Sequence, residues 1–280
     1  MLRRDLALLA NRRHDVVIVG GGIHGAAAAW EAASRGLTVA LVEAADFGGG
    51  ASWNSLKTIH GGLRHLQRLD LSGLRESARE RRALLTIAPG LVRPLGFLAL
   101  AGGGMAHGRA ALAIGMAAAD LVTRDLDRAL PPDRRLPRSR TIGAAAVQAR
   151  VPLRIGRPAS GALWWDAQVE SSDRLVLAFL HAAADAGAVV ANRLEATGVL
   201  RDDEVVAGVQ VRDGLTGATL DVQGRYVLNA AGPALEVLTR SAGVAPPKVS
   251  PLRAVNLVLR RAIVSDVAVG ERSEGRYLFA

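Results

Sequence analysis

The stretch Asp15-Val-Val-Ile-Val-Gly-Gly-Gly-Ile-His-Gly25 decides the fold of this chain. Residues 16–19 form a short β-branched run, which is typical of a buried parallel strand. Three glycines then spell G-x-G-x-x-G where the strand should give way to a helix: Gly20, Gly22 and Gly25. The alanine-rich residues 26–34 favour that helix, and Gly36 is placed to end it.

Each glycine of this pattern has its own physical role. Gly20 permits the tight turn, Gly22 lets the backbone approach a pyrophosphate, and Gly25 lets helix and strand pack closely. The helix N-terminus offers unpaired N–H groups and partial positive charge to the phosphates. Ile23 and His24 lie in the same turn, so they join the expected cofactor-binding set.

A second strand is expected over residues 38–42, and it ends in the acidic Glu43. This carboxylate can accept hydrogen bonds from an adenosine ribose; it favours a free 2′-hydroxyl and repels a 2′-phosphate. A glycine-rich loop alone is weak evidence for a ligand. Here strand, glycines, helix, second strand and acid all occur at the expected spacing, so the sequence predicts binding of an adenine dinucleotide.

Composition and absent motifs exclude several classes of function. The 280 residues, half of them hydrophobic, can bury a large core. The absence of cysteine excludes disulfides, thiolate zinc sites and cysteine nucleophiles, and no histidine spacing resembles a metal site. The commonest hydrolase and NTPase motifs do not occur. The formal charge is +9, but scattered arginines with few aromatics predict no nucleic-acid partner.

We expect a cytoplasmic protein. Residues 1–10 have too short an apolar core for a signal peptide, and the apolar stretch at 110–122 is short and interrupted by Asp120. The first ten residues favour a helix packed beside the first strand, with an amphipathic turn on the surface of the cytoplasmic membrane as the alternative.

The remaining chain is expected to mix helices and strands. The expected helices cover residues 63–87, 109–124 (buried on most sides), part of 142–151, and a segment from Ser172 or Asp173 to Ala186. The expected strands cover residues 95–100, 162–165, 189–192, a meander at 195–201, 205–213 and 218–223, a buried strand at 226–229, and strands at 255–259 and 277–280. Because the last strand stops midway, we expect the sequence to be the N-terminal portion of a longer protein.

Two loops carry further candidate residues. Residues 44–62 are expected to form a long loop. Its side chains can form hydrogen bonds and its glycines allow close approach of the backbone, which favours a functional role for the loop. Its candidates are Ala44, Ser52, Ser55, Lys57, His60, Gly61 and Gly62. The strand at 226–229 runs into Ala231 and Gly232, a second place where backbone can meet a ligand. Trp164-Trp165-Asp166 reads as a buried aromatic pair followed by a turn carboxylate.

The most specific motif is Ser52-Trp-Asn-Ser-Leu-Lys-Thr-Ile-His-Gly-Gly-Leu-Arg-His-Leu66. With the glycine turn, Ile87-Ala-Pro89, residues 164–175 and 211–217, and the Asn-Ala-Ala-Gly-Pro at 229–233, it resembles the FAD-dependent glycerol-3-phosphate dehydrogenases of the D-amino-acid-oxidase-like superfamily. The resemblance implies an α/β fold: a Rossmann-like FAD-binding domain of the glutathione-reductase/D-amino-acid-oxidase type with an incomplete substrate (cap) domain. The implied domains are residues 1–90 and 161–240 for FAD, a mostly helical insertion at 91–160, and the start of a truncated substrate domain at 241–280.

The resemblance also implies an extended FAD. Its diphosphate would lie at residues 20–25, its ribose at Glu43 and its adenine near Ala196, while Ala231 and Gly232 would close over the diphosphate. The loop from Ser52 to Gly62 would lie along the ribityl chain and flavin ring. Arg64 and His65 would face a phosphorylated or carboxylated substrate, where a guanidinium can form charge-assisted bidentate bonds.

The implied reaction is oxidation of sn-glycerol 3-phosphate to dihydroxyacetone phosphate by hydride transfer to flavin N5, with quinone as electron acceptor and a possible peripheral membrane contact. The catalytic base is expected beyond Ala280. Three positions depart from the family: His65 replaces Tyr, Asn54 replaces Arg and Asn256 replaces His. Two alternatives therefore stay open, a related flavin enzyme acting on another 2-hydroxy acid or an amine, and an inactive nucleotide-binding module.

Overall fold

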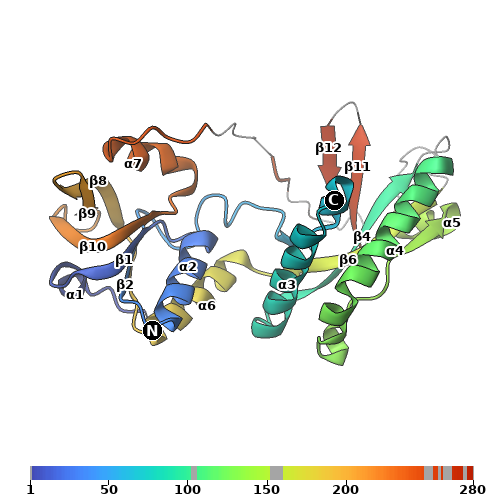
Figure 1. Ribbon diagram of the computed structural model, residues 1–280, viewed down its shortest axis with the longest axis horizontal. Coiled ribbons are helices and arrows are strands. Elements are labelled where there is room, and N and C mark those ends of the chain that lie inside the picture. Colours follow the sequence, from blue (N-terminus) through green and yellow to red (C-terminus); the bar gives the residue numbers. More distant parts are fainter. Residues whose placement is uncertain are drawn as a thin grey trace. The chain divides into compact units, whose positions relative to one another are not determined.

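The computed structural model describes residues 2–101, 106–151, 160–248, 255–257, 260, 267–273 and 276–279. The chain divides into two compact units (Figure 1). The first unit comprises Met1–Leu56 and Ser171–Asn256, and the second comprises Lys57–Glu170 and Leu257–Ala280.

The first unit is built on a six-stranded sheet in the order β7-β2-β1-β10-β9-β8. Its strands are β1 (His14–Val19), β2 (Val39–Val42), β7 (Val189–Ala191), β8 (Leu194–Asp202), β9 (Val205–Asp213) and β10 (Thr219–Asn229). β7, β2, β1 and β10 run parallel, and β10, β9 and β8 form an antiparallel meander. β10 therefore belongs to both parts, which ties the parallel half of the sheet to the meander.

Helices pack on this sheet because their apolar faces need cover. They are α1 (Leu6–Ala10), α2 (Ile23–Ser34), α6 (Ser172–Asp185), the 3-10 helix η3 (Gly232–Ala234) and α7 (Leu235–Ser241). α2 and α6 lie side by side, with the Trp30 and Phe179 ring centroids 5.4 Å apart (Figure 1). Val17 of β1, Ala40 of β2 and Val209 of β9 are fully buried in the core. The expected helix beside the first strand is confirmed as α1, whose Leu9 joins that core.

The second unit has a sheet in the order β12-β11-β4-β6-β3, with β5 also paired to β6. Its strands are β3 (Thr58–Ile59), β4 (Val92–Ala101), β5 (Arg140–Gly143), β6 (Ser160–Val169), β11 (Val267–Ser273) and β12 (Arg276–Phe279). Its helices are the 3-10 helices η1 (Leu63–Arg68) and η2 (Pro132–Arg134), with α3 (Leu71–Ile87), α4 (Ala106–Arg128) and α5 (Ala144–Arg150). α3 and α4 pack against each other and against the long β4–β6 pair.

Five expectations about these elements are wrong. The helix expected over residues 63–87 is broken: Leu69 takes a left-handed conformation with φ 54°, and Asp70 restarts the chain as N-cap of α3, accepting a hydrogen bond from Gly73 N. The strand expected at 162–165 extends over all of β6, because β4 pairs with it along its whole length. Residues 255–257 form no strand, and residues 258–259 lie outside the described part.

The other two corrections concern burial. α4 was expected to be buried on most sides, yet Ile114 and Leu121 are 70% and 69% exposed, so only one face of the helix is covered. The segment 226–229 is the end of β10 and is not fully buried. Since successive strand residues face opposite sides, Val227 packs on the core while Tyr226 is 59% exposed.

The overall class is nevertheless as predicted, a mixed α/β fold whose first unit contains four parallel strands. Among the described helices, none combines the length and apolar character needed to cross a bilayer.

Candidate functional site

The glycine turn lies where the carboxyl ends of β1, β2 and β10 meet. Gly20 N donates to Val42 O at 2.8 Å, and Ala230 N donates to Val19 O at 2.8 Å, so the turn joins all three strands. Gly20 has φ +111°, and a Cβ there would lie 2.4 Å from Ala230 O. A Cβ on Gly25 would lie 1.9 Å from Gly20 O. Both positions therefore require glycine, as the sequence pattern predicts.

Glu43 is connected to this turn by its carboxylate. Oε2 accepts a hydrogen bond from Gly21 N at 2.7 Å, and Oε1 accepts one from Ala45 N at 2.8 Å. The main chain continues the link, because Leu194 N at the start of β8 donates to Glu43 O at 2.8 Å. The acid that ends β2 therefore lies beside the glycine turn, where a ribose attached to a bound diphosphate would be within reach.

The N-terminus of α2 is the part of the site best suited to an anion. Gly22 is the N-cap and supplies no capping side chain, while Ser52 Oγ accepts from Ile23 N at 2.9 Å. A Cβ on Gly22 would lie 2.9 Å from that same Oγ. Backbone N–H groups, a hydroxyl and the positive end of a helix suit a diphosphate, and the missing side chain at Gly22 keeps the approach open. The residues present therefore fit an adenine dinucleotide.

The other predicted residues of the first unit lie near this turn or in exposed positions. Ala231 N donates to Asn229 Oδ1 at 3.2 Å just after β10, and Gly232 has φ +55°. Ala196 lies on β8, two residues after the Leu194 link to Glu43. His24, Ala44 and Ser55 are exposed.

Two of the positions that depart from the family contact each other. Asn256 Nδ2 donates to Asn54 Oδ1 at 2.9 Å. The two amides therefore satisfy one another.

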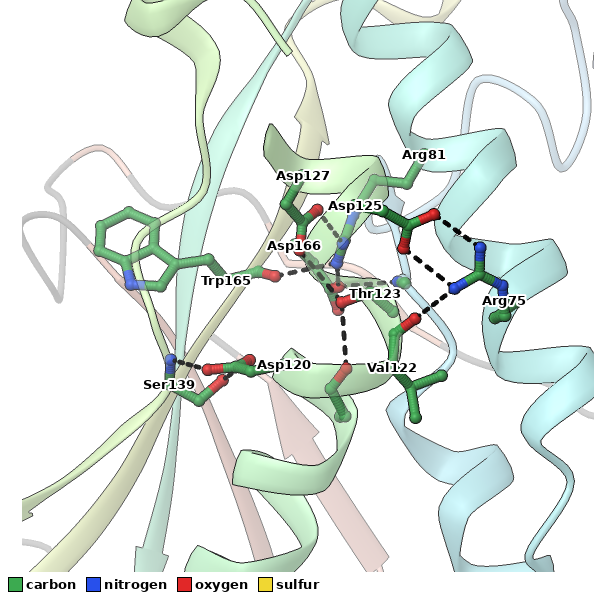
Figure 2. A network of polar contacts seen from close by, with 12 residues as sticks. Arg75, Arg81, Asp120, Val122, Thr123, Asp125, Asp127, Ser139, Trp165 and Asp166 are labelled. Carbon is green, nitrogen blue, oxygen red and sulfur yellow. Dashed lines mark hydrogen bonds and ion pairs between the residues drawn. The ribbon is translucent and has the colours of Figure 1, made fainter. Parts of the chain in front are cut away.

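In the second unit, the buried carboxylate of Asp166 binds the His60-Gly61-Gly62 segment. Asp166 Oδ1 accepts from Gly61 N at 2.7 Å and from Arg81 at 2.9 Å, and Oδ2 lies 3.2 Å from His60 Nδ1. Arg81 reaches further, donating to Trp165 O at 3.1 Å and to Asp127 at 2.9 Å (Figure 2). Arg81 and Asp166 are only 5% and 3% exposed.

Sequence reasoning missed this cluster. Asp166 was expected at a turn, but it lies within β6 and faces α3 and α4. A signal existed, because an acid in the middle of an apolar strand needs a buried partner. The partner could not be identified from the sequence, since Arg81 is one of many arginines spread along the chain.

The remaining predicted residues flank this cluster. Lys57 has φ 56°, and its carbonyl accepts from Val169 N at 2.7 Å, which ends the loop at β6. Gly62 has φ +84°, which favours glycine there. Arg64 is exposed on η1. His65 Nδ1 lies 2.9 Å from Asp70 Oδ2. The pKa of Asp70 is lowered, most strongly by the hydrogen bond from the Gly73 N–H and next by the bond to His65. Within the described residues, no group of three or more His, Cys, Asp or Glu side chains could hold a metal ion.

Comparisons with known proteins show which family the chain belongs to. The sequence pattern of a family described as "FAD dependent oxidoreductase" matches residues 15–279. "Glycerol-3-phosphate dehydrogenase" of Mycobacterium leprae (strain TN) is 36% identical over 95% of this chain and 44% of its own length. "Aerobic glycerol-3-phosphate dehydrogenase" of Staphylococcus haemolyticus (strain JCSC1435) is 31% identical over 80% of this chain and 39% of its own length. The chain thus spans less than half the length of these curated relatives.

Solved structures share the fold. The glycerol-3-phosphate dehydrogenase of Bacillus halodurans, solved with FAD, aligns over 85% of this chain and 38% of its own with a TM-score of 0.62 and 24% identity. L-proline dehydrogenase from P. horikoshii aligns over 96% of this chain and 69% of its own with a TM-score of 0.66 and 17% identity. The predicted fold type, the resemblance and the FAD cofactor class are confirmed, and the chain belongs to the family of FAD dependent oxidoreductases.

Proposed function

We propose that this chain forms the FAD-binding part of a dehydrogenase that oxidises sn-glycerol 3-phosphate to dihydroxyacetone phosphate. One observation carries the proposal: at the N-terminus of α2, Glu43 accepts a hydrogen bond from Gly21 N and Ser52 accepts one from Ile23 N. This arrangement fits an adenine dinucleotide. The substrate comes from the names of the curated relatives that match most of this chain.

Each part of the cofactor has residues suited to it. Backbone N–H groups at the start of α2 would hold the diphosphate, and Glu43 would bind the adenosine ribose. Ala196 would lie near the adenine, and Ala231 would close over the diphosphate. The Ser52–Gly62 loop, with Ser55, Lys57 and His60, would border the flavin. When bound, FAD supplies the acceptor for the hydride that leaves carbon 2 of the alcohol.

Arg64 is the residue best suited to the phosphate of the substrate. It is exposed, and among the described residues its guanidinium has no ion-pair partner. A planar guanidinium binds a phosphate through charge-assisted, bidentate hydrogen bonds. His65 would lie in the same pocket, held by its bond to Asp70.

The finer parts of the proposal concern electron transfer and location. We propose that electrons pass on to a quinone and that the protein works in the cytoplasm with peripheral contact to the membrane. The formal charge of +9 favours contact with anionic lipid.

A second substrate class is supported by the altered polar groups. His65 is tied to Asp70, and Asn54 and Asn256 bond to each other, so three positions differ chemically from the family pattern. These differences favour a related 2-hydroxy acid or an amine as an alternative substrate.

Anaerobic flavin reduction tests these proposals. The purified chain is loaded with FAD, its flavin absorbance is recorded, and glycerol 3-phosphate, a 2-hydroxy acid and an amine are added separately. Bleaching by glycerol 3-phosphate alone supports the first proposal, and bleaching by another compound supports the second. Flavin binding without bleaching by any substrate would mean that this chain on its own acts as a nucleotide-binding module, and absence of flavin binding contradicts the cofactor site itself.

A further inference from the structure

We propose that Asp166, held in place by Arg81, is a positioning residue that fixes the imidazole of His60 with its proton on Nδ1 and its lone pair on Nε2. The inference rests on the proposed function, which places His60 beside the flavin and the alcohol. It concerns the orientation of His60, which no expectation from the sequence included.

The hydrogen bonds to Asp166 determine which atom is the donor in its hydrogen bond with His60. Its carboxylate accepts from Gly61 N, from Arg81 and, at 3.4 Å, from Trp164 Nε1. Arg81 contacts Asp166 at 2.9 Å, and an aspartate carboxylate accepts hydrogen bonds and donates none. A neutral His60 that bonds to it at 3.2 Å must therefore carry its proton on Nδ1.

The opposite nitrogen is then the acceptor. Nε2 lies 3.3 Å from the hydroxyl of Thr58, a group that can donate to it. The His60 side chain is 61% exposed, whereas that of Asp166 is 4% exposed. A buried anion thus holds an accessible base, the relationship that gives an imidazole a fixed tautomer in acid–base sites.

Packing limits rotation of the ring. The His60 and Phe97 ring centroids are 5.5 Å apart, and Phe97 stacks in turn on Trp164 at 5.6 Å. Gly61 fixes the adjacent backbone, because its N–H binds the same carboxylate at 2.7 Å. The ring and the backbone of one segment are therefore held by the same side chain, Asp166.

Arg81 is itself held by a second carboxylate. Arg81 is the guanidinium shared by two carboxylates, Asp166 and Asp127, at 2.9 Å each (Figure 2). In the proposed oxidation the hydride leaves carbon 2 for the flavin and the hydroxyl proton must leave the oxygen; Nε2 is the atom suited to receive that proton.

Nitrogen-15 NMR of the histidine rings in the FAD-loaded 280-residue chain tests the inference directly. The His60 signals are identified by their absence in His60→Gln. We expect the Nδ1–H tautomer in the unsubstituted protein, and the Nε2–H tautomer there overturns the proposal without any need for a variant. Asp166→Asn, whose amide can donate to Nδ1, is expected to shift His60 to the Nε2–H tautomer.

The matched control is Asp125→Asn. Asp125 also pairs with an arginine of α3, Arg75, at 2.7 Å, but it does not touch His60 or Arg81. We expect no change of tautomer in this variant. Equal effects of the two substitutions would show a general disturbance of the unit and overturn the positioning role.

Flavin reduction by glycerol 3-phosphate gives a second readout. Asp166→Asn should lower the limiting rate constant by about 10²-fold or more, the usual contribution of a positioned base, with a small change in the substrate concentration for half-maximal rate. Asp125→Asn should stay within about twofold of the unsubstituted rate. If no alcohol reduces the flavin in any variant, the proposed function fails, yet the tautomers still decide whether Asp166 orients His60.

Discussion

The backbone N–H of Gly21 donates a 2.7 Å hydrogen bond to Oε2 of Glu43. One carboxylate therefore supports the glycine turn and faces the place proposed for the ribose. Glu43→Ala removes both roles, whereas the amide oxygen of Glu43→Gln can still accept from Gly21. We expect a loss of FAD affinity of about tenfold for Glu43→Gln, about 1.4 kcal/mol of binding free energy, and a larger loss for Glu43→Ala.

Titration of the apoprotein with FAD, followed by flavin fluorescence, measures this difference. Glu31→Ala is the matched control, because Glu31 is an exposed acid on the neighbouring helix α2 that bonds to Arg35. Its FAD affinity should stay unchanged. An unaltered affinity in Glu43→Ala would contradict the proposed ribose site.

Ser52→Ala removes the hydroxyl that accepts from Ile23 N at the start of α2. Because this oxygen acts as a cap from outside the helix, we expect the free energy of unfolding of the first unit to fall by about 0.5–2 kcal/mol in the absence of cofactor. FAD affinity should fall as well.

Urea denaturation followed by circular dichroism measures the loss, with Ser34→Ala as control. The Ser34 hydroxyl bonds to carbonyls in the last turn of the same helix, a contact that contributes little to stability. Equal stability of the two variants would argue against a capping role for Ser52.

The nucleotide-binding half of the fold could be predicted from sequence because its signals are local. Strand, glycine turn, helix and acid follow one another within residues 15–43, and each has a residue type that its conformation requires, as the contacts of Gly20 and Gly25 demonstrate. The breaks were harder to predict. Leu69 has no residue-type signal for a left-handed conformation, so the helix at 63–87 read as continuous although Asp70 restarts it.

The second unit was less predictable because long-range pairs determine it. Asp166 meets Arg81 across 85 positions and Gly61 across 105, and neither spacing leaves a pattern in one sequence. The expected burial of residues 226–229 failed for a related reason. Which face of a strand is covered depends on helices elsewhere in the chain, and Tyr226 lies on the exposed face.

His14 gives the first unit a pH-dependent stability. Burial lowers the pKa of His14 from 6.5 because the charged ring would lose its hydration, and the hydrogen bond to Leu9 O opposes this shift in part. The unfolded chain then binds more protons than the folded one just below pH 6.5. Stability is therefore full above about pH 6.5 and falls as pH drops through the window between the unfolded and the lower folded pKa, by at most about 1.4 kcal/mol per pH unit.

Unfolding free energies of the cofactor-free chain at pH 7.5, 6.5 and 5.5 test this dependence. In His14→Gln the amide can still donate to Leu9 O but does not titrate, so the decline with pH should be shallower than in the unsubstituted chain. Parallel profiles for the two proteins would show that other groups cause the decline.

Gly61 and Gly115, both in the second unit, should respond in opposite directions to alanine. A Cβ on Gly61 would lie 2.0 Å from Nη1 of Arg81, and this guanidinium cannot simply move aside because Asp166, Asp127 and Trp165 O hold it. Gly61→Ala should therefore break the buried ion pairs and lower the free energy of unfolding by about 3–5 kcal/mol.

Gly115 lies within α4, and a Cβ there meets no heavy atom within 4 Å. Gly115→Ala should raise stability by about 0.5–1 kcal/mol, because alanine loses less backbone entropy in a helix. Guanidinium denaturation midpoints of the two variants measure both effects on the same unit, and a Gly61→Ala midpoint equal to that of the unsubstituted chain would mean that the Arg81–Asp166 cluster is free to rearrange.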